Sequence, residues 1–231
     1  MSQIFNSPSS SAVQVAGQSS LFSVHRIYCV GRNYMEHALE MGGDPDREEP
    51  FFFTKPADAI WQGDDELPFP PRTNNLHHEV ELVVAIGSEG RDVDVADALS
   101  LIYGYAVGVD MTRRDLQNEA KERRRPWDMA KGFDCSAPMS NIARVEEIGH
   151  PDSGVISLTV NGEDRQSGNL NQQVWNVPEI VANLSTYVTL KPGDLIMTGT
   201  PAGVGPLRPG DLVACEIEGI GELGFQMGQP A

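Results

Sequence analysis

Turn-forming residues divide this chain into short segments, and this division limits the folds that it can adopt. The 231 residues include 23 glycines and 16 prolines. Glycine supplies the positive φ of tight turns, and proline fixes φ and donates no backbone hydrogen bond, so both residues interrupt long helices. Hydrophobic residues make up 40% of the chain, which is enough for a packed core at this length. The sequence therefore predicts an α+β fold that is mainly β with a few helices, a mixed β-roll or barrel.

Several segments have the signature of strands or of the turns between them. The Asn161-Gly162 pair predicts a tight hairpin, because both residues readily adopt positive φ. The Pro-Gly-Asp-Leu sequences at 192–195 and 209–212 each predict a turn that opens a strand. Apolar and β-branched runs predict strands at 25–30, 51–53 (short and buried), 76–87 (the clearest) and 104–111.

Four segments predict helices, and one terminal segment predicts little order. The helices are expected at 33–41 with Asn33 as the cap, at 94–102 with Asp94 as the cap, at 113–125 and at 178–187. Residues 1–20 are rich in serine and glutamine, which is typical of a loosely ordered extension. No linker follows, so we expect a single domain at 21–231.

Charge and cysteine content restrict the classes of partner. The formal net charge of −16 argues against nucleic acid and against an anionic membrane surface. An anionic substrate is still compatible with this charge, because a bound divalent cation reverses the local field. The three cysteines are far apart and match neither a disulfide framework nor zinc spacing. With no export signal or long apolar run at the N-terminus, the expected location is the cytoplasm.

Three acidic residues occur in runs that otherwise resemble buried strands. Glu79 and Glu81 are two residues apart, so their side chains share one face of the predicted strand, and Asp110 ends the next apolar run. Buried carboxylates that face one another need a cation, and hard divalent ions prefer oxygen ligands. Glu79 and Glu81 could instead face solvent or pair with arginine, and Asp110 could cap the following helix. We expect a magnesium site with Glu79, Glu81 and Asp110 as ligands, with manganese or calcium as alternatives.

A histidine and a glutamate share the predicted helix at 33–41. His37 and Glu40 are three residues apart and can share a hydrogen bond on one face. A carboxylate that orients an imidazole makes it a good general base for activating water, although a local pair on an exposed helix explains the same spacing more simply. His77 shares the strand face of Glu79 and Glu81 and raises an iron site of the oxygenase kind as a minor alternative.

Two further segments offer groups for an anionic ligand. Lys131 stands in an apolar, glycine-containing segment, where it either pairs with a carboxylate, binds an anion or is solvated. The glycine-rich turn at 198–205 can present backbone N–H groups and the Thr200 hydroxyl to a carboxylate, or can simply be a hairpin. It lacks the spacing of a nucleotide-binding loop.

Together these segments resemble the short, single-domain members of the fumarylacetoacetate hydrolase family, from about residue 25 to the C-terminus. Each motif is weak alone, but their order along the chain is specific. The matching segments are YCVGRNY at 28–34, FTKP at 53–56, HHEVEL at 77–82, GVDMT at 108–112, WDMAKGFD at 127–134, VNG at 160–162 and GDLIMTGTPAGVG at 193–205.

The resemblance implies the family's C-terminal-domain β-roll, a homodimer, and a single catalytic domain at 21–231. It implies three roles for nine residues: metal ligands Glu79, Glu81 and Asp110; catalytic residues His37, Glu40 and Lys131; and substrate contacts Arg32, Gln117 and Thr200. The segment 44–53 is most similar to the members that hydrolyse fumarylpyruvate in gentisate breakdown. The implied activity is therefore magnesium-dependent cleavage of a carbon–carbon bond in an acylpyruvate, a small 2-keto acid, during aromatic catabolism.

Three other functions remain open at this point. An oxaloacetate decarboxylase and a 2-hydroxyhepta-2,4-diene-1,7-dioate isomerase/decarboxylase use the same metal site within the family. A non-catalytic, metal-stabilised binding module is the alternative from another class. The second carboxylate of fumarylpyruvate also needs a partner, for which Arg113, Arg114 and the arginines at 123–125 are candidates, although a solvated face explains most of them.

Overall fold

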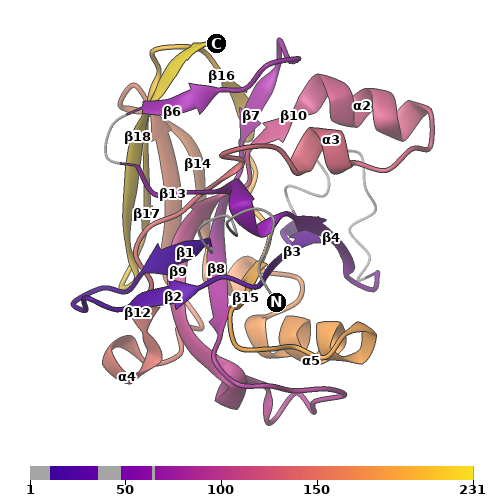
Figure 1. Ribbon diagram of the computed structural model, residues 1–231, viewed down its shortest axis with the longest axis vertical. Helices are drawn as coiled ribbons and strands as arrows, with labels where there is room; N and C mark the ends of the chain where they lie inside the picture. The colour runs from indigo at the N-terminus through magenta and orange to yellow at the C-terminus, as the bar shows by residue number, and fades with distance from the viewer. Residues whose placement is uncertain (1–10, 36–47, 64–65, 231) are drawn as a thin grey trace, which may run out of the picture.

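A six-stranded sheet forms the centre of the molecule. The computed structural model describes residues 11–35, 48–63 and 66–230 (Figure 1). The central sheet has the order β12-β9-β8-β15-β3-β4, and only the β15–β3 pair is parallel. Its strands are β3 (Arg26–Gly31), β4 (Phe51–Lys55), β8 (Val80–Ile86), β9 (Ile102–Val109), β12 (Ala143–Arg144) and β15 (Asp194–Met197).

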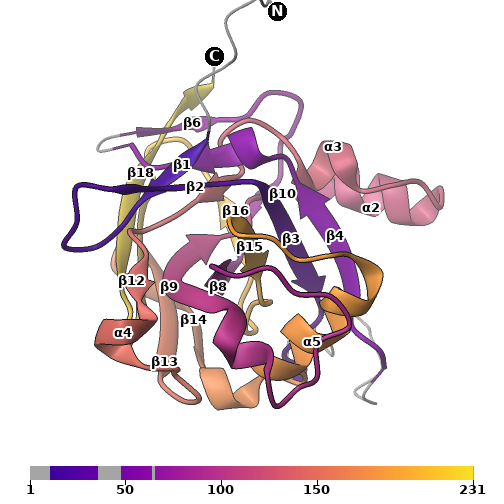
Figure 2. The same ribbon diagram turned by 60° about the horizontal axis from the view of Figure 1, so that its bottom comes forward.

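A five-stranded sheet packs against the central one. Its order is β14-β13-β17-β18-β6, and only the β18–β6 pair is parallel. Its strands are β6 (Glu66–Phe69), β13 (Val155–Val160), β14 (Glu163–Asn169), β17 (Leu212–Ile217) and β18 (Gly221–Pro230). The strand pairing keeps the two sheets separate, so the predicted mainly β roll is confirmed, in an open form and not as a closed barrel. Figure 2 shows the same strands with the bottom of the molecule turned forward.

The central sheet is buried on both faces. On β8, Val80, Leu82, Val84 and Ile86 belong to the apolar cluster that fills the space between the two sheets. The alternate residues Val83 and Ala85 belong to a second cluster on the opposite face, together with β3 and β9 side chains. Glu81 is two residues before Val83 along β8, so its side chain lies on the same face as Val83 and Ala85. Glu81 is accordingly buried, with 2% of its surface exposed.

Three small sheets complete the strand structure. They are β10-β7-β16, β1-β2 and β11-β5. Their strands are β1 (Ala12–Gln14), β2 (Leu21–Ser23), β5 (Ile60–Trp61), β7 (Leu76–His78), β10 (Thr112–Arg113), β11 (Ala137–Pro138) and β16 (Gly205–Leu207). Val13 and Val15 are buried, so the packed part of the chain includes residues before 20.

The helices lie around the sheets. They are α2 (Arg114–Glu122), α3 (Asp128–Lys131), α4 (Val145–Ile148) and α5 (Val177–Tyr187), with single 3-10 turns η1 (Ala57–Ala59), η2 (Ala98–Leu101) and η3 (Leu170–Gln172). Figure 1 shows α2 and α3 side by side near β10 and β4, and α5 at the opposite end of that side. Among the described residues, no helix is long and apolar enough to cross a membrane.

Locally encoded elements form as predicted. Asn161 and Gly162 have φ of 55° and 78° and join β13 to β14. The helix predicted at 178–187 is α5, whose Asn176 side chain accepts from Glu179 N at 3.1 Å while Glu179 Oε2 accepts from Asn176 N at 3.0 Å. Both Pro-Gly turns open strands, β15 and β17, with φ of 95° at Gly193 and 90° at Gly210.

Four predictions need correction. The strand at 76–87 is interrupted at Glu79, and the run 51–53 is the partly exposed edge strand β4. The helix at 94–102 is wrong: only the turn η2 forms there, because Ile102 joins β9 and pairs with Ile86. Asn33 does not use its carboxamide as a cap, since that group bonds to Trp175 and Thr198. Most of the predicted helix at 33–41 lies outside the described residues.

Candidate active site

The three predicted metal ligands meet at one end of the β8–β9 ladder. Glu79 occupies the break between β7 and β8, and Asp110 follows β9, with Asp110 N donating to Glu79 O at 2.8 Å. All three side chains are buried, with Glu79 5%, Glu81 2% and Asp110 0% exposed. One ligand oxygen from each lies within 4.8 Å of the others. Asp110 does not cap α2, whose N-cap residue is Arg113 without a side-chain cap bond.

Three buried cations lie against these acids. Lys131 Nζ is 3.0 Å from Glu79 Oε2 and 2.5 Å from Asp110 Oδ2. Lys55 Nζ is 2.8 Å from Asp110 Oδ1, and Arg114 Nη2 pairs with Glu79 Oε1. The apoprotein cluster thus holds three carboxylates and three cations. Burial without this balance would cost several kcal/mol per ion.

Lys131 is held as a cation at the floor of the site. It is 2% exposed, and Thr112 Oγ1 accepts a third hydrogen bond from its Nζ at 2.6 Å. Burial by itself lowers the pKa of Lys131, but the charges of Asp110 and Glu79 outweigh it, so that this pKa is raised. Lys131 therefore remains positive and fixed in place.

Glu81 differs from the other two acids because none of the described cations forms an ion pair with it. In the described part of the chain, its carboxylate accepts one hydrogen bond, from Gly199 N to Glu81 Oε2 at 2.7 Å. Gly199 has φ of 97°, and a Cβ there would lie 2.6 Å from Asn33 Cβ, so glycine allows this approach. Burial first, and then the charges of Asp110 and Glu79, raise the pKa of Glu81 well above its usual value.

These features suit a divalent cation. Hard ions take carboxylate oxygens, and the three acids converge on one point. Glu81 is deprotonated only at a cost in the apoprotein, and Asp110 Oδ1 has no hydrogen bond of good geometry although Lys55 Nζ lies nearby. A bound divalent cation would accept the Glu81 carboxylate and Asp110 Oδ1 as ligands. Among the described residues, no other group of three or more histidine, cysteine, aspartate or glutamate side chains gathers in this way.

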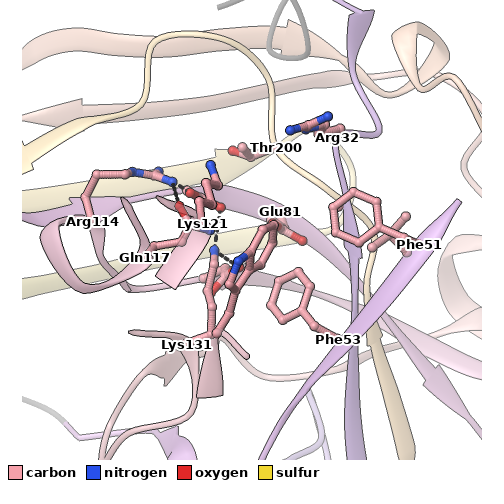
Figure 3. Close-up of a pocket in the computed structure, with 14 residues that line it drawn as sticks. Arg32, Phe51, Phe53, Glu81, Arg114, Gln117, Lys121, Lys131 and Thr200 are labelled. Atoms are coloured by element: carbon pink, nitrogen blue, oxygen red, sulfur yellow. Dashed lines mark hydrogen bonds and ion pairs between the residues drawn. The ribbon is translucent and has the colours of Figure 1, made fainter. Parts of the chain in front are cut away.

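A pocket opens above the acids, and all the described site residues predicted from the sequence contribute to it. Arg32, Gln117, Lys131 and Thr200 line it with the acids (Figure 3). His37 and Glu40, the predicted general-base pair, lie outside the described residues. The remaining wall residues are Val30, Gly31, Phe51, Phe53, Arg114, Lys121 and Trp127.

The polar groups of the pocket wall are already oriented by neighbours. Arg114 Nη1 donates to Gln117 Oε1 at 2.6 Å, which leaves the Gln117 amide nitrogen to face other groups. The Thr200 hydroxyl donates to Val80 O at 2.7 Å and accepts from Gln166 Nε2 at 2.7 Å. The Thr200 hydroxyl therefore donates its proton to a backbone carbonyl of the protein, and these two hydrogen bonds hold the Thr200 side chain in one rotamer.

Aromatic side chains form the opposite wall. The ring centroids of Phe51 and Trp127 are 5.7 Å apart, and those of Phe53 and Trp127 are 5.9 Å apart, both in edge-to-face arrangements. Figure 3 shows Phe51 and Phe53 facing Lys131 and Glu81 from β4. Such a wall suits a flat, conjugated ligand and lowers the local dielectric.

His77 takes no part in the acid cluster. Its Nε2 lies 3.0 Å from Asn75 Oδ1, and Arg114 Nε donates to its Nδ1 at 3.4 Å. Burial, and then the charge of Arg114, lower the pKa of His77 to about 4, so the ring is neutral at pH 7. The histidine–carboxylate iron site considered from the sequence is not formed by the described residues.

Some contributors are not apparent in the sequence. Lys55 and Gln166 reach the site from β4 and β14, across long chain separations. Lys55 belongs to the FTKP motif, but neither residue was assigned a role at the site from the sequence. Arg114 was one of several arginine candidates, and its ion pair with Glu79 and its place in the pocket wall distinguish it. Lys121 occurs in a run of charges that is typical of a solvated helix face, and its pocket position follows from the packing of α2.

Known proteins are similar to this chain in sequence and in architecture. The model of the fumarylacetoacetate (FAA) hydrolase C-terminal family matches residues 26–227. Fumarylpyruvate hydrolase of Ralstonia sp is 45% identical over 185 residues, covering 80% of this chain and 96% of that protein. Mitochondrial oxaloacetate decarboxylase of Dictyostelium discoideum is 41% identical over 196 residues, covering 84% and 89%. The crystal structure of fumarylpyruvate hydrolase from Pseudomonas aeruginosa with Mn2+ and pyruvate superimposes with a TM-score of 0.96 at 46% identity, covering 98% and 99%.

Proposed function

The chain belongs to the fumarylacetoacetate hydrolase family, and from this premise we propose that it hydrolyses fumarylpyruvate to fumarate and pyruvate. The observation that carries the proposal is the convergence of Glu79, Glu81 and Asp110 beside Lys131 in one pocket. A related enzyme of that name binds Mn2+ and pyruvate on the same fold.

We propose Glu79, Glu81 and Asp110 as the ligands of a magnesium ion. When bound, the divalent cation polarises the 2-keto acid and neutralises negative charge. Lys131 adds a fixed positive charge at the same place. Because its three donors are occupied by Glu79, Asp110 and Thr112, Lys131 acts on the substrate through its charge while those bonds persist.

The protein groups then have distinct tasks. His37, oriented by Glu40, accepts a proton from a water that attacks the C4 carbonyl carbon. The C3–C4 bond breaks, its electron pair passes to the pyruvate enolate, and protonation at C3 gives pyruvate while the acyl part leaves as fumarate. Arg32, Gln117 and Thr200 orient the chain of the substrate. The aromatic wall of Phe51, Phe53 and Trp127 excludes water from the developing charge.

The remaining features of the proposal follow the family resemblance. We propose a single catalytic domain, a homodimer, a cytoplasmic location and a role in the breakdown of aromatic compounds. The three cysteines are free, which is compatible with a reducing compartment.

Product analysis separates this activity from its competitors. The purified protein with Mg2+ is incubated with fumarylpyruvate, acetylpyruvate, oxaloacetate or 2-hydroxyhepta-2,4-diene-1,7-dioate. We expect loss of the diketo acid absorbance with stoichiometric pyruvate. Pyruvate and carbon dioxide from oxaloacetate alone would assign a decarboxylase instead, and metal binding without turnover of any of the four would indicate a binding module.

Two variants test the assignments of the groups. His37→Ala should lower turnover by about 100-fold or more, the usual loss for a general base, and leave metal binding intact. Glu81→Ala should remove the dependence on magnesium. An unchanged rate in the first variant, or normal activation by magnesium in the second, would contradict the respective role.

A further inference from the structure

We propose that Lys121 recognises the second carboxylate, at the acyl end of the substrate, and thereby makes the enzyme selective for dicarboxylic acylpyruvates. The inference rests on the proposed function, because it assigns the residue that binds the acyl end of the proposed substrate. The proposed interaction is a charge-assisted hydrogen bond that the Lys121 ammonium donates to the carboxylate at the acyl end.

The first support is the distribution of cations in the pocket. Five line it or its floor, and Lys55, Arg114 and Lys131 are paired with the acids of the cluster. The other two are Arg32 and Lys121, and neither has an ion pair with any acid in residues 11–35, 48–63 and 66–230. A substrate with two carboxylates brings one negative charge to the acid cluster and another that needs a cation elsewhere.

The second support is the position of Lys121 on α2. Arg114, Gln117 and Lys121 are spaced at i, i+3 and i+7, so they lie along one face of the helix, and all three line the pocket (Figure 3). Arg114 and Gln117 are buried, whereas Lys121 is half-buried. At 1.5 Å per residue, Lys121 lies about 10 Å along the axis from Arg114, and an extended seven-carbon dicarboxylate spans about 7 Å. The distal carboxylate of a substrate anchored at the acids therefore lies within reach of a flexible lysine.

The third support is that the ammonium group is kept in place without an anion. Lys121 Nζ lies 5.3 Å from the centroid of the Trp127 ring, which holds the cation against the aromatic wall. Burial first, and then the positive charges of Arg114 and Arg32, lower the pKa of Lys121. The group is a partly desolvated cation beside other cations, and a carboxylate that enters the pocket relieves that repulsion.

The other arginine candidates do not occupy this position. Arg113 stacks on the Phe133 ring at 4.2 Å and donates to Met129 O at 3.1 Å, outside the pocket wall. Arg123 pairs with Glu119 at 2.9 Å on the exposed side of α2. Arg124 and Arg125 are exposed and do not line the pocket.

The test is the selectivity of a charge-neutral variant. Steady-state kinetics with Mg2+ compare fumarylpyruvate, which has a carboxylate at the acyl end, with acetylpyruvate, which has a methyl group there. In Lys121→Met, we expect the ratio of the two kcat/KM values to fall by about 10- to 100-fold, mainly through the KM for fumarylpyruvate, as for the loss of one charged hydrogen bond. Lys121→Arg should retain most of the selectivity.

Arg123→Met serves as the matched control, because it removes a charge from the same end of α2 outside the pocket. It should leave the ratio unchanged. An equal fall for both substrates in Lys121→Met, or an unchanged ratio, would overturn the inference, and a selective loss in Arg32→Met with none in Lys121→Met would give the role to Arg32.

Product inhibition provides a second test, in which the inhibition constants of fumarate and pyruvate are measured. This test does not require that the enzyme cleave acetylpyruvate. The inhibition constant of fumarate should rise about 10-fold or more in Lys121→Met while that of pyruvate changes little. Equal changes for both products would contradict the assignment. If the wild-type protein cleaves neither diketo acid, the proposed function fails; if it cleaves both and only the selectivity result is negative, the role of Lys121 alone fails.

Discussion

Replacing Lys131 by methionine tests the charge balance of the site. The wild-type cluster has three carboxylates against three cations, and Lys131 bonds to two of the carboxylates while 2% exposed. Methionine keeps much of the side-chain volume but removes two buried ion pairs and leaves the three acids with one cation fewer. Breaking a buried ion pair in this way costs about 3–5 kcal/mol. For a chain of this size, the melting temperature should fall by roughly 6–20 °C.

The assay is unfolding in EDTA and again with excess Mg2+. The divalent cation supplies the positive charge that the variant lacks, so Mg2+ should stabilise Lys131→Met more than it stabilises the wild type. Lys121→Met is the control, since Lys121 has no ion pair with a described acid and its loss should change stability by less than about 1 kcal/mol.

Two results would refute the reasoning. One is a Lys131→Met protein as stable in EDTA as the wild type, because the ion pairs would then carry no net stabilisation. The other is an equal stabilisation of both proteins by Mg2+, because the cation would then not interact with the charge that Lys131 balances.

Three further changes follow from the contacts. Glu81→Gln removes a buried carboxyl group whose raised pKa makes the metal-free protein less stable as pH rises above about 4.5. The variant should therefore be more stable than the wild type in EDTA at pH 8 and should lose the thermal shift with Mg2+. A variant that is less stable in EDTA would contradict this. Gln166→Leu removes four hydrogen bonds, to His78, Val80, Thr200 and Pro201, and should cost about 2–4 kcal/mol in urea unfolding; a cost below about 0.5 kcal/mol would show that these bonds are replaced. Burial tends to raise the pKa of Asp115, but hydrogen bonds from Asn74 N, the Thr73 hydroxyl and Leu116 N outweigh it and lower this pKa. The ionised Asp115 therefore stabilises the fold above about pH 4, and this stabilisation is lost at lower pH. Asp115→Ala should cost about 1 kcal/mol at pH 7 and less at pH 3, and an equal cost at both pH values would contradict this pH dependence.

The sequence by itself determined the elements whose energetics are local. The Asn161-Gly162 turn, the capping box of α5 and the Pro-Gly turns before β15 and β17 depend on φ preferences and on hydrogen bonds within a few residues. The spacing of Glu79 and Glu81 also predicted that the two carboxylates lie close together, although Glu79 lies in the break between β7 and β8 and only Glu81 is on the strand. The motifs indicated the family because several short segments, each weak alone, occur in the chain in the order that is specific to that family.

The tertiary structure alone decided which buried charges meet. The break at Glu79 arises where β7 joins one sheet and β8 another, and the helix expected at 94–102 yields to the pairing of Ile102 with Ile86. Lys55 pairs with Asp110, 55 residues later in the chain, and Arg114 pairs with Glu79, 35 residues earlier. Nothing near Lys55 or Arg114 in the sequence indicates these partners. Ion pairs and sheet register depend on distances between segments, and only packing sets those distances.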